Sequence, residues 1–83
     1  MAFVYILECC DGTLYTGYAN NVAERLKKHQ QGIASKYTRS RLPVKLVYYE
    51  ELQTKSEALK RELAIKNLNR CQKQMLIEEF KQK

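Results

Sequence analysis

Two short runs of apolar and aromatic residues open the chain, and a turn separates them. Residues 3–10, FVYILECC, are nearly continuous in apolar side chains, and residues 13–18, TLYTGY, favour a second strand. Asp11-Gly12 between the two runs is typical of a tight hairpin turn. The pattern therefore predicts a β-hairpin at the start of the chain.

A helix is predicted after the hairpin. Asn20 or Asn21 can cap it, and Glu24 follows Asn21 at capping-box spacing. We expect the helix to run to about Gln31 and to stop at Gly32, a residue common just after helix ends.

The apolar stripe of this helix is narrow. It consists of Val22, Ala23 and Leu26. Arg25 and His29 lie one turn apart along the edge of the stripe, so neither side chain is expected to point cleanly into solvent.

The second half of the chain predicts a third strand and two more helices. Residues 33–43 lack a steady period and are expected to form a loop, whereas residues 44–52, VKLVYYEEL, favour a strand. A capping box over residues 54–57 starts a helix that should reach about residue 68. After a break near Asn69, a last helix is predicted over residues 72–81, with Met75, Leu76 and Phe80 facing inward.

The order of elements is thus ββαβαα. This order suggests an α/β fold in the broad sense and, more specifically, an α+β fold: a small three-stranded antiparallel sheet flanked by about three helices. With 83 residues, the chain is expected to form one domain over residues 1–83. Its core must be thin, so buried polar groups should be hard to tolerate.

Glu62 breaks the hydrophobic pattern of its helix. At about 100° per residue, the apolar side chains of residues 58–66 fill an arc roughly 160° wide, and Glu62 falls near its middle. An unpaired buried carboxylate costs several kcal/mol, a large share of the stability of a small domain. Glu62 must therefore pair with a cation such as Lys66 or Arg25, bind a metal, or open onto a cleft. The apolar positions of this arc are Ala58, Leu59, Leu63 and Ile65.

The composition indicates in which cellular compartment the protein is expected. No apolar run approaches the length of a membrane span, and the first ten residues lack the cationic lead and cleavage site of a signal peptide. Cys9, Cys10 and Cys71 are odd in number, and no C-x-x-C pair or second histidine indicates zinc. We therefore expect reduced thiols and a cytoplasmic protein that does not bind membranes.

Charge favours a polyanionic partner. Fifteen Lys and Arg against nine Asp and Glu give a net charge of +6 on a small body. Such a field attracts nucleic acid first and an anionic membrane second, although solvated lysines alone can produce it.

Three further groups of residues carry side chains that are suited to catalysis or to binding. The hairpin places Tyr5 near Tyr15, and Gly17 permits close approach of backbone or ligand, although tyrosines also suit half-buried strands. Arg25 is suited to gripping phosphate, and His29 is either a proton shuttle or a structural residue. Cations surround an aromatic residue in and beside the loop, where they either follow a phosphate backbone while Tyr37 stacks on a base or remain solvated. That loop group comprises Lys36, Tyr37, Arg39, Arg41 and Lys45.

The order and spacing of these features match a known family. VYI at residues 4–6, YTG at 15–17, Arg25, His29 and Glu62 on a later helix together resemble the GIY-YIG nuclease superfamily over nearly the whole chain. The stretches YTGYANNVAERLKKHQQG and ALKRELAIK are the most specific parts. The chain looks closest to the small stand-alone UPF0213 type.

The resemblance implies a site and a reaction. The family hydrolyses phosphodiester bonds with one divalent cation, usually Mg²⁺ or Mn²⁺. By correspondence, Tyr5 and Tyr15 are the motif tyrosines, Arg25 is the helix arginine, and Glu62 is the metal ligand. His29 occupies a position where the family often has His, Lys or Tyr.

The resemblance also distributes mechanistic roles. Arg25 would neutralise charge on the scissile phosphate, and Tyr15 would orient or deprotonate the attacking water. Unperturbed tyrosine has a pKa of about 10, so its phenolate at pH 7.5 costs about 3.4 kcal/mol. Tyr5, Tyr18 and His29 are candidates for tuning that cost or passing the proton on.

This sequence departs from the family pattern in two places. The motifs are VYI and YTG, but both tyrosines and the glycine are retained. Many members carry an asparagine after the glutamate helix, and Gln72 and Gln74 are the candidates for that position here. With no appended targeting module in these 83 residues, we expect little sequence specificity.

Two functional hypotheses follow. The first is a metal-dependent endonuclease acting on DNA, with RNA as an alternative substrate and a homodimer as an alternative state on the substrate. The second is a nucleic-acid-binding module that keeps the fold without catalysis. The retained tyrosines, Arg25 and Glu62 favour the enzyme.

Overall fold

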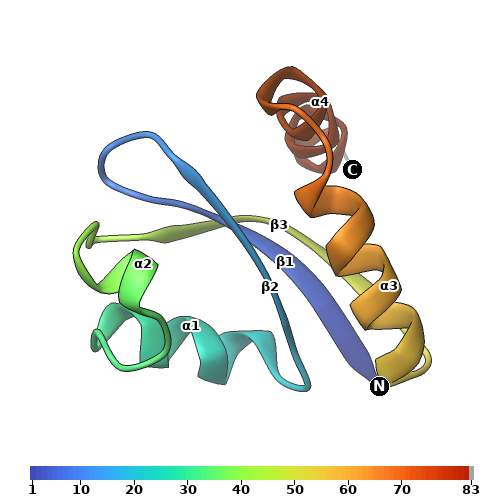
Figure 1. The fold of residues 1–83 in the computed structure, drawn as a ribbon, viewed down its shortest axis with the longest axis horizontal. Helices are drawn as coiled ribbons and strands as arrows, with labels where there is room; N and C mark the ends of the chain where they lie inside the picture. Colours follow the sequence, from blue (N-terminus) through green and yellow to red (C-terminus); the bar gives the residue numbers. More distant parts are fainter. Residues whose placement is uncertain (83) are drawn as a thin grey trace.

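The computed structural model describes residues 1–82 and shows a three-stranded antiparallel sheet with helices on both faces. Strand β1 (Ala2–Glu8) is central, with β2 (Leu14–Ala19) on one side and β3 (Lys45–Leu52) on the other. The helices are α1 (Val22–Gln30), α2 (Lys36–Arg39), α3 (Lys55–Lys66) and α4 (Arg70–Lys81), as Figure 1 shows. The predicted antiparallel sheet is confirmed.

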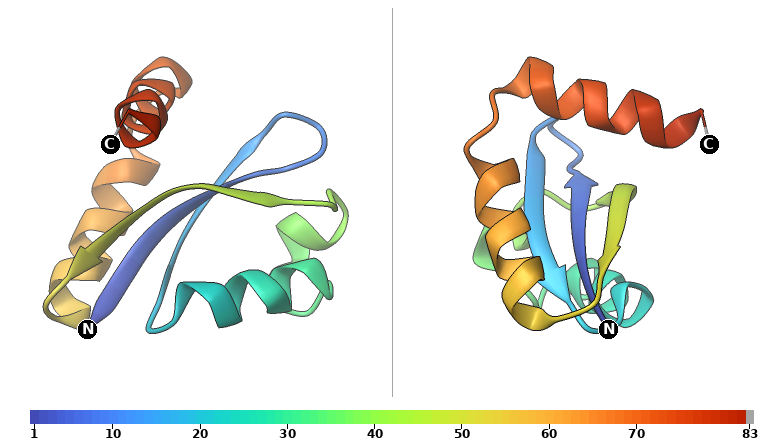
Figure 2. Two further views of the ribbon diagram at one scale, coloured as in Figure 1. Left: turned by 180° about the vertical axis from the view of Figure 1, so that it is seen from behind. Right: turned by 90° about the vertical axis from the view of Figure 1, so that its right-hand side faces the viewer.

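The two faces of β1 belong to two separate core clusters. Val4 and Ile6 pack on one face with Ala58 and Ile65 of α3, and Ile77 of α4 joins them. On the other face, Tyr5, Leu7 and Cys9 pack with Ala19 and Val44, against Val22 and Leu26 of α1. Figure 2 shows the helices on opposite sides of the sheet. Because β1 is buried on both faces, its sequence is nearly continuous in apolar residues instead of alternating.

The element boundaries follow local capping signals. The Asn21 side chain accepts the Glu24 backbone N–H, and Thr54 does the same for Glu57, as their spacing predicted. Gly12 closes the hairpin turn with φ +85°.

The break between the last two helices is itself a cap. The Asn69 side chain accepts the Gln72 N–H, and the Gln72 side chain accepts the Asn69 N–H, which completes a capping box. The last helix therefore begins at Arg70, two residues earlier than predicted.

Part of the predicted loop is helical. Residues 36–39 form the single turn α2, capped by the Ser35 side chain, so the order is ββααβαα and not ββαβαα. A helix of four residues is too short to produce a hydrophobic period, which is why the sequence did not reveal it.

Several predicted core positions were wrong. Ala23, Leu59, Leu63 and Met75 are exposed, and Ile77 is the buried residue of α4. Leu76 and Phe80 do pack partly against the first cluster. None of the helices in residues 1–82 is both long enough and apolar enough to cross a membrane.

Candidate active site

Tyr5 lies at the centre of the candidate site. It sits in the middle of β1, is 1% exposed, and pairs across the sheet with Gly17 of β2. A Cβ atom at Gly17 would lie 2.6 Å from the Tyr5 hydroxyl oxygen and 2.7 Å from its Cζ. Gly17 is therefore required for space, because only a residue without a side chain lets the phenol cross this point of β2.

His29 of α1 hydrogen-bonds the Tyr5 hydroxyl. The Tyr5 oxygen lies 2.8 Å from His29 Nε2, and the imidazole is 1% exposed. The other ring nitrogen, Nδ1, lies 2.9 Å from the Thr38 hydroxyl of α2, which is fully buried. The histidine therefore joins the central strand to the short helix that the sequence did not reveal.

The hydrogen bonds indicate which nitrogen of His29 carries the proton. Thr38 donates its hydroxyl hydrogen to the Ser35 carbonyl at 3.3 Å, so its oxygen is free to accept from Nδ1–H. Nε2 then accepts from the Tyr5 hydroxyl. Nothing in the sequence around Thr38 pointed to this role.

Charged side chains act on the same phenol. Burial raises the pKa of Tyr5 well above its usual range, and neighbouring Tyr15 and Glu62 raise it further, whereas the positive charge of Arg25 lowers it. Burial, followed by the charge of Arg25, lowers the pKa of His29. Tyr5 and His29 are therefore neutral at neutral pH, and Arg25 and Glu62 are both near enough to influence Tyr5.

Aromatic rings extend from this centre toward α2. The Tyr15 ring lies 5.3 Å from that of His29, edge to face, and 5.9 Å from that of Tyr37, in a stacked arrangement. Arg41 Cζ lies 3.9 Å from the centroid of the Tyr37 ring. The hairpin thus brings Tyr5 and Tyr15 together around His29, as predicted.

Glu62 lies on the inward half of α3, between the buried residues Ala58 and Ile65. Its side chain is 19% exposed and pairs with Lys66 at 3.5 Å. The carboxylate thus has one of the three arrangements predicted for it, a cation partner, and it keeps partial access to water.

The neighbouring residue, Arg61, is bonded to the sheet. Its Nε lies 3.1 Å from both carboxylate oxygens of Glu50 on β3. Because successive helical residues differ by 100°, anchoring Arg61 to β3 turns Glu62 toward another part of the sheet.

The donor set fits a lightly held divalent cation. In residues 1–82, no three His, Cys, Asp or Glu side chains gather as a metal-binding group. Mg²⁺, however, is commonly held by one or two carboxylates, with water and substrate phosphates completing the shell. The partly accessible Glu62 meets that requirement as a single carboxylate.

Arg25 opens onto a hollow at the start of α1. The hollow measures about 220 Å³ and is also lined by Ala19, Asn21, Glu24 and Lys28. Tyr5 and His29 are buried and do not line this hollow.

The other predicted binding residues are spread more widely. Tyr18 lies opposite Val4 and packs with the first core cluster, on the face of the sheet away from Tyr5. Lys36 and Arg39 are exposed on α2, at the rim of a hollow that also includes Gly32. Lys45 pairs with Glu8 at 3.3 Å.

The two glutamines proposed for the family asparagine have different surroundings. Gln72 is used in the cap of α4, whereas Gln74 lines a hollow between β3 and α4 with Glu8 and Phe80.

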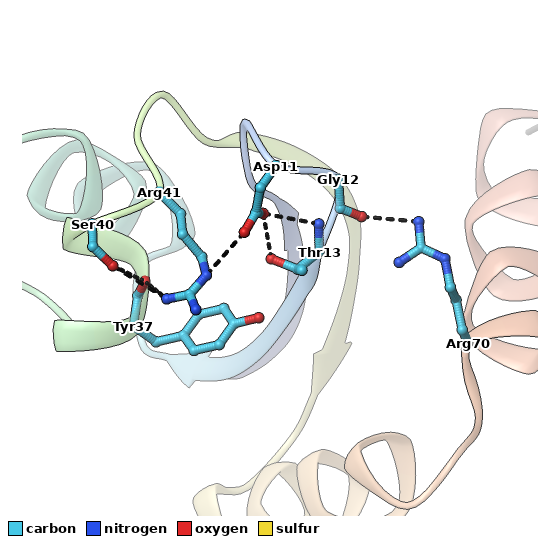
Figure 3. Close-up of polar contacts among 7 residues, drawn as sticks. All are labelled: Asp11, Gly12, Thr13, Tyr37, Ser40, Arg41 and Arg70. Atoms are coloured by element: carbon cyan, nitrogen blue, oxygen red, sulfur yellow. Dashed lines mark hydrogen bonds and ion pairs between the residues drawn. The ribbon is translucent and has the colours of Figure 1, made fainter.

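The hairpin turn ties the loop and the last helix to the sheet. Arg41 Nε donates to Asp11 at 3.1 Å, and Arg70 Nη2 donates to the Gly12 carbonyl at 2.9 Å (Figure 3). Arg41 was predicted from the sequence as a binding residue of the loop. Arg70 was not, because it lies 58 positions from its partner.

Comparison with known proteins identifies the family of the chain. The model of the GIY-YIG catalytic domain matches residues 1–75. A UPF0213 protein from Staphylococcus aureus strain Mu3 is 57% identical over 77 residues, which cover 93% of this chain and 94% of the relative.

Two solution NMR structures are also similar. The UPF0213 protein BH0048 from Bacillus halodurans is 46% identical, with a TM-score of 0.60 over 94% of this chain and 84% of its own. The protein EF2693 from E. faecalis is 39% identical, with a TM-score of 0.63 over 98% and 86%. The chain therefore belongs to the GIY-YIG catalytic domain family, among the relatives named UPF0213.

Proposed function

We propose that the protein is a metal-dependent endonuclease that hydrolyses phosphodiester bonds in DNA with little intrinsic sequence specificity. The observation that carries the proposal is a buried phenol, Tyr5, whose hydroxyl is hydrogen-bonded to the His29 imidazole and whose pKa responds to the charges of Arg25 and Glu62. Membership of the GIY-YIG family supports the same reaction class.

Arg25 supplies positive charge for the scissile phosphate. The charge of its guanidinium lowers the pKa of both Tyr5 and His29, and Arg25 lines the hollow at the start of α1. A guanidinium can donate two parallel hydrogen bonds to a phosphate and offset the charge that develops there during attack.

Glu62 holds the divalent cation, Mg²⁺ or Mn²⁺. When bound, the cation supplies positive charge to the phosphate and favours a nucleophilic water. The ion pair with Lys66 is exposed on the lysine side, so the carboxylate can exchange this partner at small cost.

The tyrosines and His29 accept and transfer the proton that the attacking water loses. Tyr15 orients the attacking water. The proton that the water loses passes by way of Tyr15 to the buried Tyr5–His29 pair, where Nε2 of neutral His29 accepts the Tyr5 hydroxyl proton as Tyr5 is reprotonated, so the positive charge ends on the imidazole. Thr38 keeps Nδ1 protonated and Nε2 available.

One assay distinguishes a nuclease from a module that binds nucleic acid without cleaving it. The purified protein is incubated with supercoiled plasmid, branched DNA and single-stranded DNA, with Mg²⁺, with Mn²⁺ or with chelator. We expect metal-dependent cleavage that falls by at least about 100-fold in Glu62→Gln and in Arg25→Gln. Glu78→Gln is the matched control, because Glu78 is an exposed glutamate that also pairs with a lysine on its own helix, at 3.8 Å.

The alternative is a nucleic-acid-binding module without catalysis. The Glu62–Lys66 ion pair favours it, since that pair gives the carboxylate a structural role that needs no metal. If the wild type binds every substrate but cuts none faster than Glu62→Gln, the binding module is the correct assignment.

A further inference from the structure

We propose a second phosphate-binding position, formed by Arg70 and Lys73, in the hollow between the hairpin turn and the start of α4. This inference rests on the proposed action on nucleic acid and assigns a path for the strand beyond the catalytic centre. The hollow measures about 180 Å³ and is lined by Thr13, Leu14, Tyr37, Arg70 and Lys73.

The charge of this hollow is positive. Arg70 and Lys73 are its two charged lining residues, and no acidic side chain lines it. Within the described part of the chain, neither cation forms an ion pair, whereas Lys28, Lys45 and Lys66 each lie within 4 Å of a carboxylate. An unpaired cation keeps its full charge for a phosphate ligand.

The acid of the adjoining hairpin turn, Asp11, is already paired. Asp11 pairs with Arg41 at 3.1 Å and accepts the Thr13 hydroxyl and backbone N–H. The Thr13 hydrogen bonds, with a smaller contribution from Arg41, hold the pKa of Asp11 below its usual range, so it stays ionised and paired. The pair leaves the charge of Arg70 and Lys73 uncompensated.

Arg70 is held in place over the hollow. One of its terminal nitrogens donates to the Gly12 carbonyl at 2.9 Å, which leaves the remaining guanidinium donors for a ligand. Figure 3 shows Arg70 approaching the hairpin from α4, and the hydroxyl end of Tyr37 pointing to the same side. The side chain is thus ordered before a ligand arrives, which reduces the entropy cost of binding.

Aromatic contacts connect this hollow to the catalytic residues. Tyr37 lines the hollow and stacks on Tyr15, and the ring of Tyr15 contacts His29. A strand with one phosphate beside Arg25 can therefore continue across Tyr15 and Tyr37 to Arg70. The ligand class is a backbone phosphate of a nucleic-acid strand, without base specificity.

The test measures how salt weakens binding. A labelled single-stranded oligonucleotide is titrated with the protein in chelator, to prevent cleavage, over a series of salt concentrations. Each lost phosphate contact should reduce the slope of log K against log salt by about 0.7 for a single strand. We expect that reduction in Arg70→Gln and in Lys73→Gln, with similar weakening on different sequences.

Two further variants serve as controls. Lys60→Gln removes the same charge from the exposed side of α3 and should leave the slope close to that of the wild type. Arg70→Lys keeps the charge and should restore most of the slope. If Arg70→Gln and Lys73→Gln match Lys60→Gln while the wild type binds, the phosphate position is wrong and the proposed function stands. If the wild type binds no oligonucleotide, the phosphate position is wrong, and the cleavage assay with Mg²⁺ or Mn²⁺ decides the proposed function separately.

Discussion

A single missing side chain shapes the candidate site. Gly17 faces Tyr5 across two strands, and its lack of a Cβ gives the phenol room to reach His29. The sequence indicated that something approaches Gly17 closely, but it did not indicate that the neighbour is Tyr5 of the same hairpin. That identification needed the strand register, which pairs Tyr5 with Gly17.

Substitution of Gly17 tests this packing. We expect Gly17→Ala to lower the free energy of unfolding by about 1–3 kcal/mol, because the new methyl group overlaps the Tyr5 ring. Urea denaturation measures the loss. Gly12→Ala is the control: it strains a turn at φ +85° but meets no atom within 4 Å, so it should leave the Tyr5–His29 hydrogen bond intact. A Gly17→Ala protein as stable as the wild type, with that bond retained, would contradict the account.

His29 predicts a dependence of stability on pH. Burial, then the charge of Arg25, lowers its pKa in the folded state, whereas an unfolded histidine has a pKa of about 6.5. Above that value, both states are neutral and the stability is fully present. As pH falls below it, the unfolded chain binds a proton first, so stability declines by at most about 1.4 kcal/mol per pH unit.

Urea unfolding at pH 7.5 and pH 5.5 measures this effect. We expect the wild type to lose stability between the two values, and His29→Gln to lose less, because glutamine does not titrate. A wild type whose stability is constant or increases toward pH 5.5 would show that the imidazole is free to protonate in the fold.

At the scale of elements, predictions succeeded where the cause is local. Hairpin turns and helix caps depend on residues within about four positions of one another, so the turn at Gly12 and the caps at Asn21 and Thr54 were predicted correctly. The short helix α2 was missed because it has no hydrophobic period, although it provides Thr38, the partner of His29.

The orientation of α3 shows the limit of periodicity. The apolar arc predicted that Leu59 and Leu63 would be buried beside Glu62, but both are exposed. The helix instead buries Ala58 and Ile65, and Arg61 bonds to Glu50 of β3, a pair that has no signature in the sequence of the helix itself. Glu62 therefore reaches the inward half of α3 for a reason different from the predicted one.

At the scale of the whole molecule, the sheet separates support from chemistry. The face covered by α3 and α4 forms the first core cluster, while Tyr5, Tyr15 and His29 gather on the face covered by α1 and α2. Glu62 comes from the supporting side, yet its charge influences Tyr5. The family resemblance named the candidate site residues, which stay a prediction, whereas this division between faces required the fold.

The most direct test of the account locates the divalent cation. Mn²⁺ is added to isotope-labelled protein with a short oligonucleotide whose phosphorothioate linkages resist cleavage, and paramagnetic broadening is recorded by NMR. We expect the resonances of Tyr5, Gly17 and Glu62 to broaden first in the wild type and in Glu78→Gln. In Glu62→Gln, we expect this selective broadening to be lost. Broadening that centres on another part of the molecule, or that is the same in Glu62→Gln, would contradict the proposed site.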